Sequence, residues 1–264
     1  MKYISITFDD GRKDTYTRAY AIMKKYGIVG TVFVTTGYVD NTWERDVAWD
    51  SAEGPMSVEE LVTLDNEGWE IALHGDKHLT DWQDTQVSIQ KLNAWLGQRM
   101  HYGFSMPNSS APKEKIAQLE AQCGKGKPLS YIRRGRGINT KGLKAKVLFG
   151  LYSVLKSQWA YDRFNLPSVQ MLQDMDVENV KSVVIRSGDD HKMLSKFIDK
   201  APEDSLIVLM FHSILQKEDA CYGADSWYWD TNEFESFCRE MKEKQEMDKI
   251  KMIPVERVLD YVEI

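Results

Sequence analysis

The chain has 264 residues, a formal net charge of −6 at pH 7, 42% hydrophobic residues and 28% charged residues. This composition is typical of a folded globular protein, and the acidic balance argues against a general nucleic-acid binder, which needs a basic surface. The sequence has no apolar stretch of about 18 residues, so we expect no membrane span.

Short apolar runs alternate with helix-like segments along the chain. The expected strands cover residues 3–8, 31–35, 69–73, 102–105, 205–211 and 251–253. The expected helices cover residues 15–26, 57–68, 85–99, 112–122, 232–246 and 255–262, and the second of them begins with a Ser57–Glu60 capping box. Such alternation implies parallel strands joined by crossovers, and roughly six to eight units favour an α/β barrel over an open sheet.

One region fits no clear pattern. We interpret residues 124–176 as an insertion or an irregular segment of a single domain that covers residues 1–264. The three cysteines are widely spaced and form neither a disulfide framework nor a metal knuckle. Because no signal peptide precedes the first strand, we expect a cytoplasmic location.

Two adjacent carboxylates, Asp9 and Asp10, follow the first expected strand in the run Thr7-Phe8-Asp9-Asp10-Gly11. In a parallel barrel the carboxyl ends of the strands face the active site. One carboxylate there can bind a metal while its neighbour acts as a base. The alternative is a turn that merely ends the strand.

Three histidines also follow expected strands. His74 and His78 are four residues apart, and with Asp10 they form a set suited to zinc with open positions for water and substrate. His212 follows the strongly apolar strand 205–211 and could protonate a leaving group. Each histidine alone has a structural alternative, but their coincidence at strand ends favours one common site.

Together these motifs, in this order, resemble the signatures of the polysaccharide deacetylases, the NodB-homology domain of carbohydrate esterase family four. The resemblance spans residues 3 to about 262. It implies a distorted (β/α) barrel of seven or eight strands. It also implies a divalent metal, usually zinc, held by Asp10, His74 and His78, with Asp9 as the base toward metal-activated water and His212 as the acid.

The activity implied by the resemblance is hydrolysis of N- or O-linked acetyl groups on a carbohydrate. One alternative keeps the metal and changes the substrate to a small cyclic amide, imide or ureide. A second alternative is a non-catalytic homologue that binds sugar or metal. None of these functions calls for a nucleic-acid partner.

The sequence departs from the family in its third motif, usually Arg-x-Pro-aromatic, which here reads Ser105-Met106-Pro107-Asn108. Pro107 fits, and the backbone N–H of Asn108 could still serve the oxyanion. The missing arginine normally pairs with the base carboxylate. A substitute could come from the cluster Arg133-Arg134-Arg136 or from Arg186, although we favour a solvated basic loop for the cluster.

Four further residues are candidates for the site. Asp189 or Asp190 could orient His212, and the alternative is that they cap the helix that follows. Trp227 and Trp229 could stack on sugar rings, or they could pack the loops.

Overall fold

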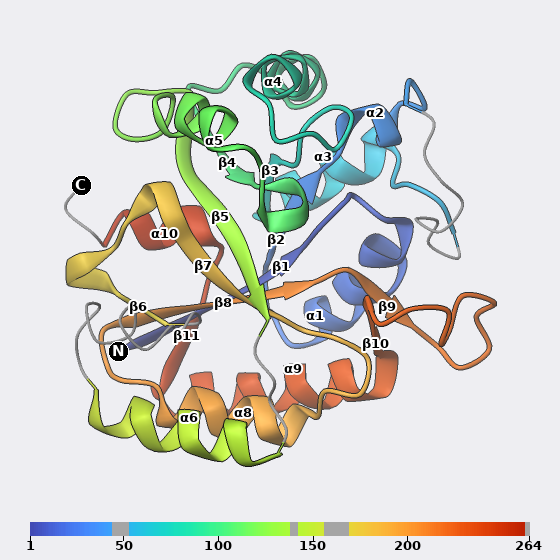
Figure 1. The fold of residues 1–264 in the computed structure, drawn as a ribbon. Helices are drawn as coiled ribbons and strands as arrows, with labels where there is room; N and C mark the ends of the chain where they lie inside the picture. Colours follow the sequence, from blue (N-terminus) through green and yellow to red (C-terminus); the bar gives the residue numbers. More distant parts are fainter. Residues whose placement is uncertain (44–52, 138–141, 156–168, 262–264) are drawn as a thin grey trace.

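The computed structural model describes residues 1–43, 53–137, 142–155 and 169–261. Within these ranges, parallel strands form a closed barrel in the order β1-β2-β3-β4-β5-β7-β8, and β8 pairs back to β1 (Figure 1). The barrel strands are β1 (Lys2–Phe8), β2 (Thr31–Val34), β3 (Glu70–Leu73), β4 (Tyr102–Ser105), β5 (Leu129–Gly137), β7 (Val180–Val184) and β8 (Ser205–Phe211). The predicted (β/α) barrel is confirmed, with seven strands.

Helical segments connect the strands and cover the outside of the barrel (Figure 1). They are η1 (Thr15–Tyr20), α1 (Ala21–Lys25), α2 (Thr36–Val39), α3 (Val58–Asn66), α4 (Trp82–Leu96), η3 (Pro107–Ser109), α5 (Lys113–Glu120), α6 (Gly142–Val154), η4 (Leu172–Asp174), η5 (Val177–Asn179), α8 (His191–Lys200), α9 (Thr231–Glu246) and α10 (Val255–Leu259). The predicted capping box of α3 is confirmed. Within the described ranges, no helix has the length and apolar character needed to cross a membrane.

The barrel is distorted beside β1. This strand pairs with β8 along its whole length, but with β2 only at Thr7 and Phe8. The short strand β11 (Ile250–Met252) pairs with the first part of β1, which β2 does not reach. Three further short strands complete the sheets: β6 (Gln170–Met171) runs antiparallel to β8, and β9 (Ser213–Leu215) pairs with β10 (Tyr228–Asp230).

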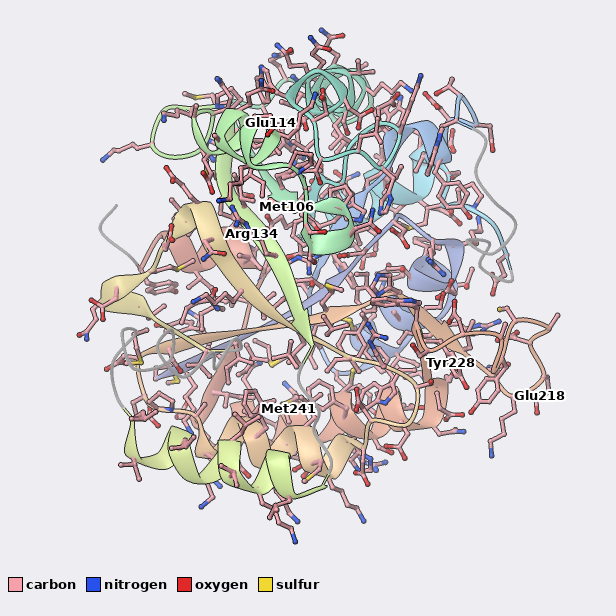
Figure 2. The ribbon with its side chains drawn as sticks, in the orientation of Figure 1. Met106, Glu114, Arg134, Glu218, Tyr228 and Met241 are labelled. Carbon is pink, nitrogen blue, oxygen red and sulfur yellow. The ribbon has the colours of Figure 1, made fainter. Side chains whose placement is uncertain are left out.

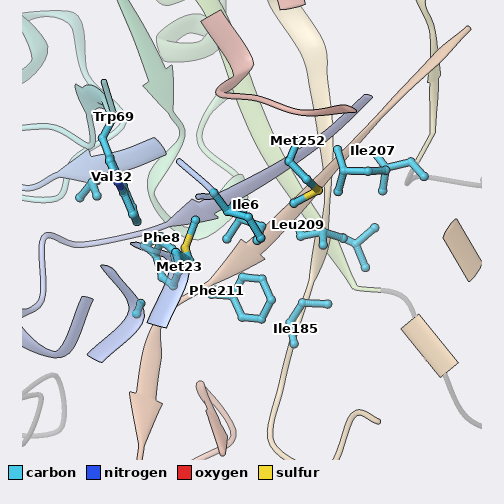
Figure 3. Packing of buried hydrophobic residues seen from close by; sticks show 14 of the residues in the cluster. Ile6, Phe8, Met23, Val32, Trp69, Ile185, Ile207, Leu209, Phe211 and Met252 are labelled. Carbon is cyan, nitrogen blue, oxygen red and sulfur yellow. The ribbon is translucent and has the colours of Figure 1, made fainter. Parts of the chain in front are cut away.

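Alternation along the strands separates two buried layers. One layer, which includes Ile6, Phe8, Leu209 and Phe211, packs between the barrel and its helices (Figure 3). The other layer fills the barrel interior and contains Phe33, Ala72, Tyr131, Leu206 and Val208. Because successive side chains point to opposite faces, the last inward positions of the strands and the residues after them meet at one end of the barrel.

The interior layer requires a glycine at position 103. A Cβ added to Gly103 on β4 would lie 2.3 Å from the ring of Tyr131. Tyr131 cannot move aside easily, because it is fully buried and its hydroxyl donates a 2.6 Å hydrogen bond to Glu70.

We therefore expect Gly103→Ala to lower the free energy of unfolding by roughly 1–3 kcal/mol through overpacking. Urea unfolding followed by circular dichroism measures the free energy of unfolding of the variant and of the wild type. The matched control is Gly150→Ala, because its backbone is helical and nothing lies within 4 Å of the position where its Cβ would be. Equal stability of Gly103→Ala and the wild type would show that the interior can rearrange.

The structure corrects the interpretation of residues 124–176. Residues 129–137 form β5, a full barrel strand, rather than an insertion or a solvated loop. The interpretation failed because the run Arg133-Arg134-Gly135-Arg136 is too polar to resemble a buried strand. Strand β7 was also missed. The predicted last helix ends at Leu259, and Val262 lies outside the described residues.

Candidate metal centre and active site

A cavity of about 670 Å³ lies at the carboxyl end of the barrel. Its lining includes all five residues predicted to carry chemistry: Asp9, Asp10, His74, His78 and His212. They come from three segments, after β1, after β3 and after β8. Their convergence is the outcome expected when parallel strands end at the same face of a barrel.

Asp10 directs one carboxylate oxygen at both histidines. Its Oδ1 lies 3.4 Å from Nε2 of His74 and 3.8 Å from Nε2 of His78. This oxygen is buried and has no hydrogen-bond partner among the described residues. The backbone of Asp10 is in the left-handed region, with φ of +80°, a conformation that costs a non-glycine residue free energy. Asp10, His74 and His78 therefore form a group of residues that could hold a metal ion.

The loop that carries His74 and His78 is held by the start of α4. The Asp84 carboxylate accepts hydrogen bonds from the backbone N–H groups of Asp76, at 2.8 Å, and Lys77, at 3.0 Å. Gly75 makes this approach possible, because an added Cβ would lie 2.5 Å from Asp84 Oδ2. Nothing in the local sequence pattern marks Asp84 as part of the site.

His74 is oriented by a second contact. Its Nδ1 lies 2.8 Å from the backbone carbonyl oxygen of Ser105, which fixes the proton on Nδ1 and leaves Nε2 directed at Asp10. A histidine that ligates a metal through one nitrogen generally donates the other ring N–H to an acceptor of this kind.

The electrostatics of the cluster also favour a positive ion. Burial would raise the pKa of Asp10, but Arg12 and the nearby histidines hold it well below its usual value. Burial disfavours the charged form of His74, yet the Asp9 and Asp10 carboxylates outweigh it and raise its pKa. Burial and the neighbouring His74 lower the pKa of His78 to about 3, so His78 is neutral and able to donate a lone pair. The residues therefore fit a divalent cation.

Of the arginines considered as substitutes for the missing one, Arg133 on β5 is the one that contacts Asp9. Nη2 of Arg133 lies 2.5 Å from both carboxylate oxygens of Asp9, and its Nη1 donates a 2.8 Å hydrogen bond to Ser182. Arg133 is only 1% exposed, and its guanidinium lies over the Phe33 ring. The interpretation of the arginine cluster as a solvated loop is therefore wrong for Arg133.

Register explains how Arg133 reaches this place. Ser105 on β4 is its direct partner in the sheet, and the small Ser105 side chain leaves room for the guanidinium, which donates to its hydroxyl. The next residue, Arg134, pairs instead with Glu120 at 2.6 Å. Figure 2 labels Arg134 on β5 and Met106 just after β4.

His212 follows β8 directly and is fixed from both sides. The backbone N–H of Asp9 donates a 3.0 Å hydrogen bond to the carbonyl of Phe211, and the His212 ring lies 4.6 Å from the Trp227 ring. Burial lowers the pKa of His212 to about 4, although the carboxylates of Asp10 and Asp9 oppose the shift.

The structure does not support the predicted orienting aspartates. Nδ1 of His212 has no hydrogen-bond partner among the described residues. Asp190 caps α8 by accepting from the Lys192 N–H, which was the alternative interpretation. Asp189 accepts a 2.8 Å hydrogen bond from the backbone N–H of Arg186. Neither aspartate lines the cavity.

The remaining predicted residues divide between the cavity and the core. Trp227, Arg186 and Asn108 line the cavity, whereas Pro107, the residue before Asn108, is buried and does not line it. Trp229 is only 1% exposed and packs against Phe211 and Phe234, so no sugar ring can stack on it.

Arg12 is a cavity residue that the sequence analysis missed. Its Nε donates a 2.9 Å hydrogen bond to Asp10 Oδ2, and its Nη1 donates to the Ser213 hydroxyl at 3.0 Å. These contacts leave Oδ1 as the carboxylate oxygen of Asp10 available to a cation. They also connect Asp10 to the residue after His212. The feature of the sequence that could have identified Arg12 is its position two residues after Asp10.

Comparison with known proteins gives a family match over the first part of the chain and a shared fold over nearly all of it. Residues 1–125 match the family model described as polysaccharide deacetylase. None of the curated proteins compared with the chain matches it significantly.

Among solved structures, the chain is similar to the Xyl-CE4 domain of a multidomain xylanase from the hindgut metagenome of Trinervitermes trinervoides. The two are 13% identical with a TM-score of 0.53, over 98% of this chain and 90% of the other. A family 4 acetyl xylan esterase from Clostridium thermocellum, solved with a cobalt ion, is 10% identical with a TM-score of 0.52, over 98% and 91%.

A mutant of BA3943, described as a family 4 pseudoenzyme with restored activity, is 12% identical with a TM-score of 0.51, over 99% and 69%. At such identities these structures show a shared fold alone. The match over residues 1–125 contains Asp9, Asp10, His74 and His78. The resemblance to the polysaccharide deacetylase family that the motifs predict is therefore confirmed.

Proposed function

We propose that the protein is a metal-dependent hydrolase that removes acetyl groups, N- or O-linked, from a carbohydrate. The observation that carries this proposal is the convergence of Asp9, Asp10, His74, His78 and His212 on one cavity. The fold alone would not support it, because one structure with the same barrel is described as a pseudoenzyme.

Asp10, His74 and His78 would hold the divalent cation, which when bound supplies Lewis acidity toward an acyl carbonyl and toward water. Asp9, oriented by Arg133, accepts the proton of the attacking water. Asn108, which lines the same cavity, would donate its backbone N–H to the developing oxyanion.

His212 then donates a proton to the departing nitrogen or oxygen. Burial lowers the pKa of this imidazole to about 4, and the Asp10 and Asp9 carboxylates oppose the shift by favouring the protonated form that this role requires. Trp227 packs against the ring and keeps it directed into the cavity. Arg12 fixes Asp10 and, through Ser213, the chain next to His212.

The first test is metal content. After incubation with zinc and desalting, we expect about one zinc per wild-type chain by elemental analysis, and none in His74→Ala/His78→Ala. Acetate release from a panel of acetylated oligosaccharides should disappear in the same variant.

The matched control is His101→Ala/His191→Ala, which removes two histidines outside the cavity. It also removes the histidine of a second group of possible metal-binding residues, Asp190, His191 and Glu233. Metal content equal to that of the wild type is expected. A wild-type protein that takes up no metal would overturn the proposed mechanism.

A further inference from the structure

Arg186 lies just after β7 and lines the same cavity as Asp10 and His212. Its guanidinium lies over the ring of Trp227, with Cζ 4.0 Å from the ring centroid. Nη1 donates a 3.1 Å hydrogen bond to the Ser226 hydroxyl. Among the described residues, no carboxylate forms an ion pair with Arg186.

Arg186 is exposed, but hydrogen bonds hold the chain segment that carries it. The backbone N–H of Arg186 donates to Asp189 Oδ2 at 2.8 Å, and the backbone N–H of Ser187 donates to the Ser226 carbonyl at 3.0 Å. An arginine stacked on an aromatic ring keeps its in-plane donors available for a carboxylate or phosphate. Such ordering before binding reduces the entropy lost when an anion is bound.

The charge of the cavity also favours an anion. Asp9 and Asp10 are neutralised by Arg133 and Arg12. Two charged residues of the lining then remain, Arg186 and Asp225. Oδ1 of Asp225 accepts a 2.7 Å hydrogen bond from the backbone N–H of Trp227. Since the acids and arginines balance, a divalent cation at Asp10, His74 and His78 would make the cavity positive, although the whole chain carries a net charge of −6.

We propose that Arg186, stacked on Trp227, binds an anionic substituent of the substrate, so that the preferred substrate is an acetylated sugar bearing a carboxylate or a phosphate. The removal of an acetyl group from this substrate rests on the proposed deacetylase function. The binding of an anion by Arg186 does not depend on that function. It changes the expected role of Trp227, because one face of the indole carries Arg186 and is closed to a sugar ring.

The kinetic test compares N-acetylglucosamine with its 6-phosphate, its 1-phosphate and its uronic acid. For the wild type we expect kcat/KM for acetate release to be about tenfold to hundredfold higher for at least one anionic sugar. Arg186→Gln should lose this preference and leave the neutral substrate within about twofold. Arg239→Gln, at an exposed arginine on α9, should keep it. Comparison of the sugar phosphates with the uronic acid shows whether Arg186 prefers a phosphate or a carboxylate.

A binding test is independent of turnover. Calorimetric titration of the zinc-loaded protein uses glucose, glucose 6-phosphate, glucose 1-phosphate and glucuronic acid, none of which has an acetyl group to release. We expect tighter binding of an anionic sugar to the wild type and to Arg239→Gln, but not to Arg186→Gln, even though all three carry metal.

The two proposals fail in different ways. If no acetylated sugar is turned over while anionic sugars still bind through Arg186, the deacetylase function is wrong and the subsite stands. If neutral and anionic sugars bind and react equally, or if Arg186→Gln keeps the preference for anions, the subsite is wrong.

Discussion

Replacing Asp9 with asparagine is expected to lower kcat/KM for acetate release by a factor of about 10²–10⁴, the usual contribution of a general base. The amide has the shape of the carboxylate but cannot accept the proton of the attacking water. The metal should remain, because the proposed ligands Asp10, His74 and His78 are unchanged. Kinetics and elemental analysis on the same samples measure both outcomes.

Asp9→Asn also leaves the guanidinium of Arg133 buried without its carboxylate, which can destabilise the fold. The double variant Asp9→Asn/Arg133→Gln removes this unpaired charge. We expect it to be as inactive as Asp9→Asn and more stable in thermal unfolding. The matched control is Asp225→Asn, at an exposed cavity acid. More than a tenth of wild-type activity in a folded Asp9→Asn would show that Asp9 is not the base.

Loss of Arg133 is expected to have the next largest effect. Arg133→Ser should lower kcat/KM by about tenfold to hundredfold, because Asp9 loses a charged hydrogen-bond partner that orients it. Arg134→Gln, on the same strand but paired with Glu120, is the control and should change activity little.

Moving the arginine back to β4 tests whether its place or only its charge matters. In the double variant Ser105→Arg/Arg133→Ser the guanidinium starts from the neighbouring strand, at the position where the family usually has it. The backbone carbonyl of Ser105 that holds His74 is retained. We expect activity to recover by at least about fivefold over Arg133→Ser. A folded double variant with no recovery would contradict the view that Arg133 replaces the missing arginine.

Local patterns in the sequence were sufficient to predict the barrel and the five polar residues that converge on its cavity. Asp9, Asp10, His74, His78 and His212 each follow an apolar strand, and parallel strands bring such positions to one face. The capping box of α3 was likewise readable, since both of its residues lie within one turn.

The tertiary structure decided what surrounds those residues. Arg133 lies 124 positions from Asp9 in the sequence, and its role depends on the register between β4 and β5. The sequence of β5 is too polar to be recognised as a strand, although the inner face of the strand is buried. The places of Arg12 and Asp84 also depend on the tertiary structure, because both form hydrogen bonds with other segments of the chain.

Trp227 and Trp229 show most directly why the tertiary structure was needed to decide which residues line the cavity. They are two residues apart and similar in sequence context, yet one lines the cavity beneath Arg186 and the other is sealed in the core. The sequence by itself determined which segments become strands and which polar residues end them, because those signals are local. Which side chains then become partners was decided only when the barrel closed, because closure sets the distances between segments that the local pattern leaves open.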